Sequence, residues 1–267
     1  VLIGDDMTVK NLFESEQFKE KVELMRDWYE KGYIMKDSAT TTASPQETVA
    51  AGKAFSFIGN QAGNYGVQEA SSMCGYDMGY VRLAKPYLDT TAVNTVTWCI
   101  SSQCKNPDKA LDFLNLTYTD SDIVNLIVFG LEGRDYVKVS DREMVFPNGL
   151  DANTVPYTAQ FSCGVVGSQF KQLVHQGTPE DNNDLMYREN HESKTSPAFG
   201  FTFDSSSVKT EYTAVTNVIN QYLSGLVWGS IDPATELPKF QEALKDAGLD
   251  TIVAEKQKQL DAWAAQK

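Results

Sequence analysis

The stretch at 104–136, CKNPDKALDFLNLTYTDSDIVNLIVFGLEGRDY, carries the clearest helix start in the chain. Asn106-Pro107-Asp108 supplies a cap, a proline in the first turn and an acidic side chain, in the order that favours a helix start. The apolar face expected for this helix includes Ala110, Phe113, Leu114 and Leu116. A second helix is expected to begin at Ser121 and to end at Gly130. This stretch therefore predicts two consecutive helices.

Two further helices are predicted upstream of this stretch. Residues 16–31 repeat apolar side chains at three- and four-residue spacing, and Ser15 is suited to cap them. The next helix begins with Ser44 as its cap, a proline in the first position and Glu47 reaching back to the cap, and it ends at Gly52.

Strand character is concentrated in three segments, 54–58, 78–83 and 92–101, which are apolar, alternating or rich in β-branched residues. A hairpin is expected from Tyr136 to Phe146, with its turn at Ser140-Asp141-Arg142. Because helices and strands are predicted in both halves of the chain, the composition of elements indicates an α/β or α+β architecture.

The last part of the chain divides into an irregular and a helical region. Residues 147–207 hold four of the nine prolines and most of the Asn/Asp/Ser clusters, and long loops of this kind are usually functional or mobile. After Val208 the chain is predicted to be helical to its end, with a break at 229–233.

Composition narrows the class of protein. The chain of 267 residues has a formal net charge of −13, and an acidic surface repels phosphate backbones and anionic lipids, so we expect no nucleic-acid partner. No apolar stretch is long enough to span a bilayer, and the first residues, VLIGDDMTVK, lack the features of a signal peptide, so we expect a mature or truncated form.

The four cysteines match neither a zinc site nor a CxxC pair. Cys99 and Cys104 are close in sequence, so a disulfide between them remains an alternative to free thiols.

The sequence contains no recognisable catalytic motif. His175 and His191 are the only histidines; neither lies in a nucleophile or metal motif, and both are expected to be solvated loop residues. A glycosidase needs two facing carboxylates, whereas Glu132 with Arg134 is expected to form a local contact. No glycine-rich loop has the ending of a phosphate-binding loop. We therefore predict no enzymatic activity, no metal and no cofactor.

The sequence contains more residues suited to binding a sugar than residues suited to catalysis. Amide groups pair with sugar hydroxyls and aromatic rings stack on the apolar faces of sugars. Carboxylates pair with sugar hydroxyls as amides do. Three clusters combine an aromatic ring with an amide or a carboxylate: Asn60, Gln61, Asn64 and Tyr65 after the first predicted strand; Gln169 with Phe170; and Phe199, Phe201 and Phe203 before Asp204. Each cluster also has a structural interpretation, because such loops form turns and alternating phenylalanines line one face of a strand.

The order of these segments resembles the second half of an extracellular solute-binding protein (family 1) of the ABC sugar importers, and in particular the lipoprotein subgroup that carries oligosaccharides. The segments that carry the resemblance are FKEKVELMRDWYEKGYI (18–34), AAGKAFSFIGN (50–60), AVNTVTWCIS (92–101), CKNPDKALDFLNLTYTD (104–120), FGLEGRDYVKV (129–139) and the tail from FGFTFDSSSVKTEYTAV through LPKFQEALKDAGLDTIVAEKQKQLDAW. Two positions depart from the family pattern. Ala62 and Gly63 stand where a stacking tryptophan is common, and GSQF replaces an expected GNQF.

The resemblance implies an α/β two-lobe fold of the periplasmic-binding-protein type (type II), incomplete at its N-terminus. Residues 1–91 would form part of the C-terminal lobe with the ligand loop, 92–170 the hinge crossing and a segment of the N-terminal lobe, and 171–267 the return to the C-terminal lobe. The implied function is capture of a carbohydrate, expected to be an oligosaccharide, outside the cell and its delivery to a membrane permease. The full-length form would be a surface lipoprotein and a monomer.

The predicted ligand-binding residues are Asn60, Gln61, Asn64, Tyr65, Gln169, Phe201 and Phe203. Trp98 and Trp228 are also able to stack on a sugar, although tryptophans in apolar elements are more often core residues. The alternative function is a glycoside hydrolase or its carbohydrate-binding accessory domain, and a third possibility is a scaffold domain without a ligand-sized pocket.

Overall fold

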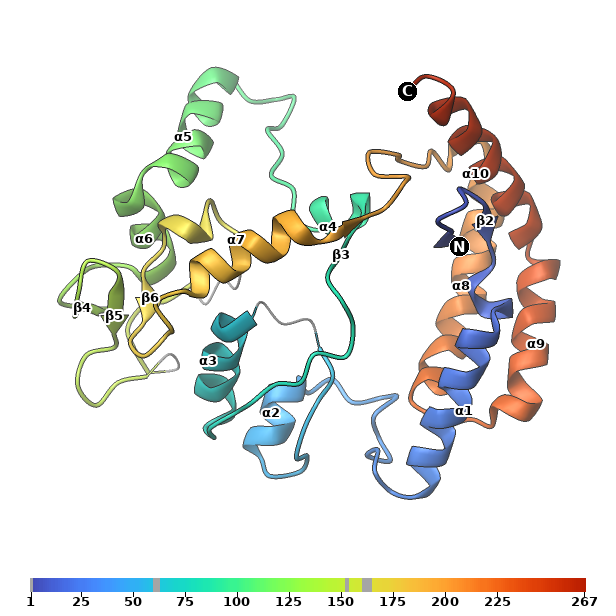
Figure 1. Cartoon of the computed structure of the whole chain (residues 1–267), viewed down its shortest axis with the longest axis horizontal. Coiled ribbons are helices and arrows are strands. Elements are labelled where there is room, and N and C mark those ends of the chain that lie inside the picture. The colour runs from blue at the N-terminus through green and yellow to red at the C-terminus, as the bar shows by residue number, and fades with distance from the viewer. Residues whose placement is uncertain (1, 60–62, 152–153, 160–164) are drawn as a thin grey trace. The chain divides into compact units, whose positions relative to one another are not determined.

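The computed structural model describes residues 2–59, 63–151, 154–159 and 165–267 of the chain (Figure 1). Two compact units are present, each built from segments that are distant in the sequence. Unit 1 consists of Val1–Ala43, Tyr87–Ala92 and Lys194–Lys267, and unit 2 of Ser44–Pro86 and Val93–Ser193.

The elements of each unit follow the chain order. Unit 1 contains β1 (Leu2–Ile3), β2 (Val9–Lys10), α1 (Glu16–Glu30), β3 (Tyr87–Leu88), β7 (Lys194–Thr195), α8 (Lys209–Val227), α9 (Pro233–Asp246) and α10 (Leu249–Ala264), with 3-10 turns at Leu12–Glu14 and Ser206–Val208. Unit 2 contains α2 (Pro45–Ala50), α3 (Gly63–Cys74), α5 (Pro107–Thr119), α6 (Ser121–Phe129), β4 (Val137–Lys138), β5 (Glu143–Val145), β6 (Val174–His175) and α7 (Asn182–Glu192), with a 3-10 turn, η2, at Gln169–Lys171. The short helix α4 (Thr90–Val93) spans the boundary.

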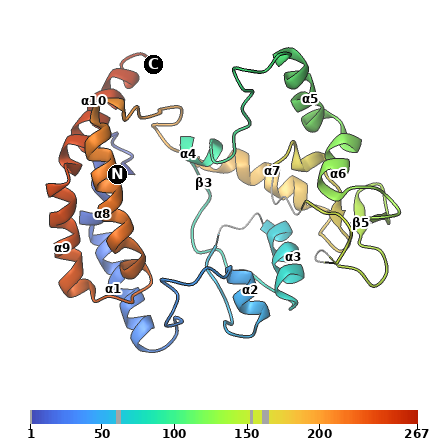
Figure 2. The ribbon, with the colours of Figure 1, turned by 180° about the vertical axis from the view of Figure 1, so that it is seen from behind.

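Unit 1 is mainly helical, and α1, α8, α9 and α10 lie side by side in both views (Figures 1 and 2). Its core is centred on Phe240, which is fully buried. The ring of Phe13 meets Phe240 edge-on at a centroid distance of 4.9 Å, and the ring of Tyr222 stacks on it at 5.4 Å. Burial of these large apolar side chains is the main stabilising contribution to the unit.

The starts of α1, α8 and α9 agree with the sequence-based prediction, whereas the start of α10 does not. Ser15 Oγ accepts a hydrogen bond from the Phe18 amide at 3.1 Å and caps α1. At α9, the side chain of Asp232 accepts from the Ala234 amide at 3.0 Å, and a proline occupies the first turn. The predicted break at 229–233 separates α8 from α9, and a second break at Gly248, which was not predicted, separates α9 from α10.

Unit 2 contains the predicted central helices and the predicted hairpin. Strands β4 and β5 pair antiparallel with Val137 opposite Val145, and β6 joins the other edge of β5 in parallel, with Glu143 opposite Val174. The unit's own core packs between α6 and this small sheet and consists of Val124, Val128, Phe129, Tyr136, Met144 and Leu173. The hairpin and the β6 segment thus cover one face of α6.

Three predicted strands are not formed, and this corrects the sequence-based expectation. Residues 54–58 and 78–83 are irregular, and the segment predicted as a strand at 92–101 begins within α4 and then continues without pairing. Most of their apolar side chains are exposed, for example Phe55 at 97% and Val81 at 83%. A strand forms only where another strand offers its backbone groups, and no strand of the described residues lies beside these segments.

Two further differences concern helices of unit 2. The region 147–207, predicted to be irregular, contains α7. The predicted apolar face of α5 is only partly buried: Ala110 and Leu114 are half-buried, whereas Phe113 and Leu116 are 52% and 42% exposed. Among the described residues, no helix combines the length and the apolar character that crossing a membrane requires.

Candidate functional site

The first predicted ligand cluster lies at the beginning of α3. Asn60 and Gln61 are outside the described residues. Asn64 and Tyr65 belong to the first turn of α3 and not to a loop, which corrects the predicted local structure. Their role in binding stays a prediction.

The second cluster forms the 3-10 turn η2 in unit 2. The side-chain amide of Gln169 donates to the sulfur of Met186 at 3.3 Å. The ring of Phe170 is 42% exposed and lines a pocket. Gln169 is not among the lining residues of this pocket, so its predicted contact with a ligand stays a prediction, whereas its neighbour in the same motif faces the cavity.

The third cluster packs into the core of unit 1. Phe201 is buried with Val9, Ala198 and Leu260, and its ring meets Trp263 edge-on at a centroid distance of 5.9 Å. Phe203 is partly buried against the same core. This packing favours the structural interpretation of both rings, although no strand forms here, and their ligand role stays a prediction.

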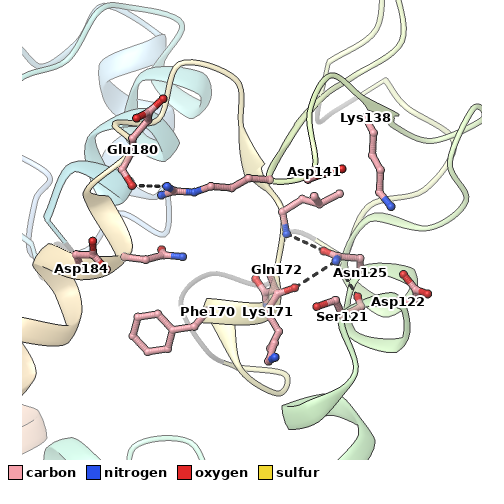
Figure 3. Close-up of a pocket in the computed structure, with 13 residues that line it drawn as sticks. Ser121, Asp122, Asn125, Lys138, Asp141, Phe170, Lys171, Gln172, Glu180 and Asp184 are labelled. Carbon is pink, nitrogen blue, oxygen red and sulfur yellow. Dashed lines mark hydrogen bonds between the residues drawn. The ribbon is translucent and has the colours of Figure 1, made fainter.

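The pocket of unit 2 has a volume of about 380 Å³. It lies where the start of α6, the hairpin, η2 and the start of α7 converge (Figure 3). The residues that line it are Ser121, Asp122, Asn125, Lys138, Asp141, Arg142, Phe170, Lys171, Gln172, Leu173, Glu180, Asn183 and Asp184. Its size is at the lower end of the range of small-molecule sites.

Asn125 fixes the floor of the pocket. The side chain is 5% exposed; its amide nitrogen donates to the carbonyls of Ser121 at 2.7 Å and Lys171 at 3.3 Å, and its oxygen accepts from the Leu173 amide at 2.8 Å. These bonds join α6 to the segment that follows η2, as the dashed lines in Figure 3 show. Since both groups of the amide are engaged with backbone, Asn125 builds the site without being free to bind a ligand.

Arg142 closes the side of the pocket between the hairpin and α7. One terminal nitrogen donates to the carbonyl of Glu180 and the other to the carbonyl of Pro179 at 3.4 Å. The Nε atom of Arg142 is buried and has no hydrogen-bond partner among the described residues. A buried donor without an acceptor is costly.

The charges around the pocket are mixed. Three cationic side chains and four carboxylates line it: Lys138, Arg142 and Lys171, and Asp122, Asp141, Glu180 and Asp184. In the part of the chain that the structure describes, no ion pair joins one of these cations to one of these carboxylates. Lys138 is paired with Glu132, and the terminal nitrogens of Arg142 donate to backbone carbonyls. The lining thus contains both donors and acceptors, and its mixed charge suits a polar ligand.

The GLEGRDY motif, residues 130–136, connects α6 to β4, whose residue Lys138 lines the pocket. Asp135 is fully buried; its carboxylate accepts from the Leu131 amide at 2.8 Å and from two nitrogens of Arg134 at 2.9 and 2.7 Å. The hydrogen bonds from Arg134 hold the pKa of Asp135 below its usual value. Glu132 pairs with Lys138 at 3.7 Å, which corrects the expected contact between Glu132 and Arg134. The motif therefore fixes the turn that leads from α6 into the hairpin.

Neither histidine is arranged for catalysis. The ring of His175 packs 5.4 Å from Phe146 and 6.2 Å from Phe129, and burial lowers its pKa, so it is not the solvated loop residue that was expected. His191 is exposed and its ring lies 4.1 Å from that of Tyr187. Among the described residues, no group of three or more histidine, cysteine, aspartate or glutamate side chains is placed to hold a metal ion.

Sequence reasoning missed most of the pocket. Its residues come from four separate segments between 121 and 184, and only the folding of α6, the hairpin and α7 brings them together. The GSQF motif was the only local signal, because it drew attention to Phe170. Asn125 and Arg142 stand in no motif that would separate them from ordinary polar residues.

Comparison with known proteins gives matches over the whole chain and over its last part. Residues 197–265, which include α8 to α10, match a domain of unknown function (DUF3502). A carbohydrate ABC transporter substrate-binding protein of Streptococcus pneumoniae is 27% identical over 275 residues, which cover all of this chain and 54% of that protein. This chain therefore spans about half the length of the curated relative that it matches.

Solved structures extend this likeness to the fold. The N-glycan transport solute-binding protein NgtS from Streptococcus pneumoniae matches 98% of this chain with 57% of its own, at 27% identity and a TM-score of 0.81. Its complexes with Man1GlcNAc and Man5GlcNAc give TM-scores of 0.80 and 0.79 at 27% and 26% identity. The predicted resemblance to the solute-binding proteins of carbohydrate ABC transporters, and the fold that it implies, are confirmed. The relatives are named as binding proteins and not as enzymes.

Proposed function

We propose that this chain is part of the substrate-binding component of an ABC importer, which captures a carbohydrate outside the cell and delivers it to a membrane permease. The observation that carries the proposal is the match of the whole chain, in sequence and in fold, to solute-binding proteins for carbohydrates. A fold alone does not determine function, but here the sequence match and the structural match point to the same class of protein.

The pocket in unit 2 supports a neutral, hydroxyl-rich ligand. Its mixed lining offers donors and acceptors, as sugar hydroxyls require, and Phe170 offers an aromatic ring. We infer that the ligand is an oligosaccharide, because the similar protein NgtS has been crystallised with Man1GlcNAc and with Man5GlcNAc. The mannose and N-acetylglucosamine units of those ligands are therefore the first candidates.

The proposal also includes the expected lobes, oligomeric state, location and ligand-binding residues. Residues 1–91 and 171–267 would serve one lobe and 92–170 the hinge and the other lobe, and the protein would act as a monomer at the cell surface without enzymatic activity. Asn60, Gln61, Asn64 and Tyr65 would contribute to the ligand site, with Gln169, Phe201 and Phe203 as secondary candidates.

The proposal is tested by a thermal-shift screen of the chain against mono- and oligosaccharides that include Man1GlcNAc and Man5GlcNAc. A ligand at about 100 to 1,000 times its Kd should stabilise the fold by roughly 3–4 kcal/mol, which raises Tm by several degrees. Tyr65→Ala should reduce this shift without changing the Tm of the free protein. A panel without any shift contradicts carbohydrate binding by this chain, and turnover of a chromogenic glycoside would favour the hydrolase alternative.

A further inference from the structure

We propose that Asn148 is a site of spontaneous covalent modification, at which the backbone nitrogen of Gly149 attacks the side-chain amide and converts the asparagine to aspartate and isoaspartate. The site lies in the exposed turn that follows β5, and neither residue lines the pocket of unit 2. The proposal is independent of the proposed function, because it depends on the covalent chemistry of the turn and not on a ligand.

The turn at 147–150 places the two reacting residues at its exposed tip. The Leu150 amide donates to the carbonyl of Pro147 at 2.9 Å, so Asn148 and Gly149 are the central residues of a β-turn. Gly149 has φ +83°, which is the conformation that the second central position of a type II turn requires. Both residues are exposed, and a Cβ atom at Gly149 would have no atom within 4 Å. There is therefore room beside Gly149 for the turn to deform into a cyclic intermediate.

Neither reacting group is occupied by a hydrogen bond in the described part of the chain. The Gly149 amide nitrogen donates to no acceptor there, and the side chain of Asn148 has no hydrogen-bond partner there. Because glycine has no side chain, nothing on Gly149 itself shields its nitrogen from the amide carbon of Asn148. The nucleophile and the carbon that it attacks are thus adjacent in the chain, exposed and without competing partners.

The reaction needs no reactant other than water. The Gly149 nitrogen forms a bond to Asn148 Cγ and loses its proton, while the Cγ–Nδ2 bond breaks and the leaving nitrogen takes up a proton, so that ammonia is released and a cyclic imide remains. Water then adds to either carbonyl carbon of the imide, and the bond between that carbon and the Gly149 nitrogen breaks. Opening at Cγ gives aspartate, whereas opening at the backbone carbon gives isoaspartate, in which the chain continues through Cγ. No atom changes its oxidation state.

Other asparagines lack this combination of neighbours and exposure. Asn125 is buried, and its amide is engaged with backbone groups. Asn106 precedes a proline, which has no N–H to lose. Asn94 is exposed and outside a helix, as Asn148 is, but the branched side chain of Thr95 crowds the nitrogen that would attack. We therefore expect Asn148 to react first.

The test is peptide mapping of the full chain by mass spectrometry after incubation at neutral and at mildly alkaline pH. Replacement of the amide NH₂ by OH should raise the mass of the peptide that contains Asn148, and ammonia should appear in the same amount. Asn94 is the internal control: Asn148 should react at least about tenfold faster, which corresponds to about 1.4 kcal/mol in activation free energy. Because the attacking nitrogen must lose its proton, the rate should rise with pH.

Three variants locate the attacking group. Gly149→Ala places a side chain beside the nitrogen and should slow the reaction of Asn148 about tenfold. Gly177→Ala is the matched control, because Gly177 has φ +88° in the same unit and its added Cβ also has no atom within 4 Å; the rate at Asn148 should stay within about twofold. Asn148→Gln should remove the mass change from this peptide. Circular dichroism verifies that each variant is folded.

Each outcome decides the proposal. If the peptide with Asn148 gains mass no faster than the peptide with Asn94, the proposal is overturned. If Gly149→Ala reacts at the wild-type rate, attack by the Gly149 nitrogen is overturned. Isoaspartate forms only through the cyclic imide, so its presence in the product supports this route, and a product that contains aspartate alone contradicts it. Sugar binding enters none of these measurements, so their result leaves the proposed function unaffected.

Discussion

Gly229 is the residue on which the contact between α1 and the turn after α8 depends. It has φ +70°, and a Cβ atom at this position would lie 2.3 Å from the carbonyl oxygen of Met25. The carbonyl of Gly229 also accepts a hydrogen bond from Arg26 at 2.9 Å. Only glycine combines the left-handed backbone with this close approach.

Gly229→Ala is therefore expected to lower the free energy of unfolding by roughly 2–3 kcal/mol, through backbone strain together with displacement of α1. Urea denaturation monitored by circular dichroism measures the change. Gly32→Ala is the matched control, because Gly32 has φ +76° in the same unit but no atom within 4 Å of its added Cβ. If the two variants lose the same stability, the close approach to Met25 does not contribute.

The buried carboxylate of Asp135 makes the stability of unit 2 depend on pH. Because its folded pKa is lowered by Arg134, the stabilisation is complete above the unfolded pKa of about 3.9 and is lost as the pH falls from there through the folded value. Asp135→Asn should therefore be less stable than wild type at neutral pH, and the difference should shrink below about pH 4.

Chemical denaturation at a series of pH values tests this expectation. Asp181→Asn, an exposed position of the same unit, is the control and should stay parallel to wild type. A constant difference between Asp135→Asn and wild type over the whole range would mean that the carboxylate contributes by shape and neutral hydrogen bonding alone.

At the scale of elements, Asn125 is the connection between α6 and the segment after η2. Asn125→Ala removes three hydrogen bonds and leaves the buried amide of Leu173 without its acceptor. The expected loss is about 1–3 kcal/mol in the free energy of unfolding, and sugar binding should weaken as well, because the pocket floor is displaced. Asn115→Ala, at an exposed position of α5, is the control and should change neither quantity. Retained stability in Asn125→Ala would contradict this role.

The helices could be predicted because their signals are local. Ser44 and Glu47 form the predicted capping box at α2, and Asp120 caps α6 through the amides of Asp122 and Ile123. Cap, proline and acidic residues act within one turn, so a single stretch of sequence contains the whole signal.

The strands could not be predicted with the same success, because pairing is not local. The hairpin at 136–146 forms, since both of its strands are neighbours in the sequence. The segments at 54–58 and 78–83 have suitable composition but no neighbouring strand among the described residues. The pocket was missed for a related reason: it depends on which polar residues four distant segments bring together. The family resemblance predicted the overall fold, because it rests on the order of many segments along the chain.

At the scale of the whole molecule, two opposing electrostatic effects act on stability. The net charge of −13 destabilises the folded chain by self-repulsion over long distances. Surface ion pairs such as Lys31 with Asp27, at 2.7 Å, oppose this, but exposed pairs contribute only about 0–1 kcal/mol each. Many of the pairs are between residues three or four apart on one helix, so they stabilise local structure more than they hold the units together.

We therefore expect added salt to stabilise the protein. Raising NaCl from about 10 mM to about 150 mM shortens the screening length from about 30 Å to about 8 Å and removes most of the long-range repulsion. If this contributes about 1 kcal/mol, Tm rises by about 2–4 °C for a chain of this size, as differential scanning calorimetry would measure. The double variant Asp27→Asn with Lys31→Gln removes one ion pair without changing the net charge and should show the same rise. A fall in Tm with salt would mean that the ion pairs outweigh the repulsion.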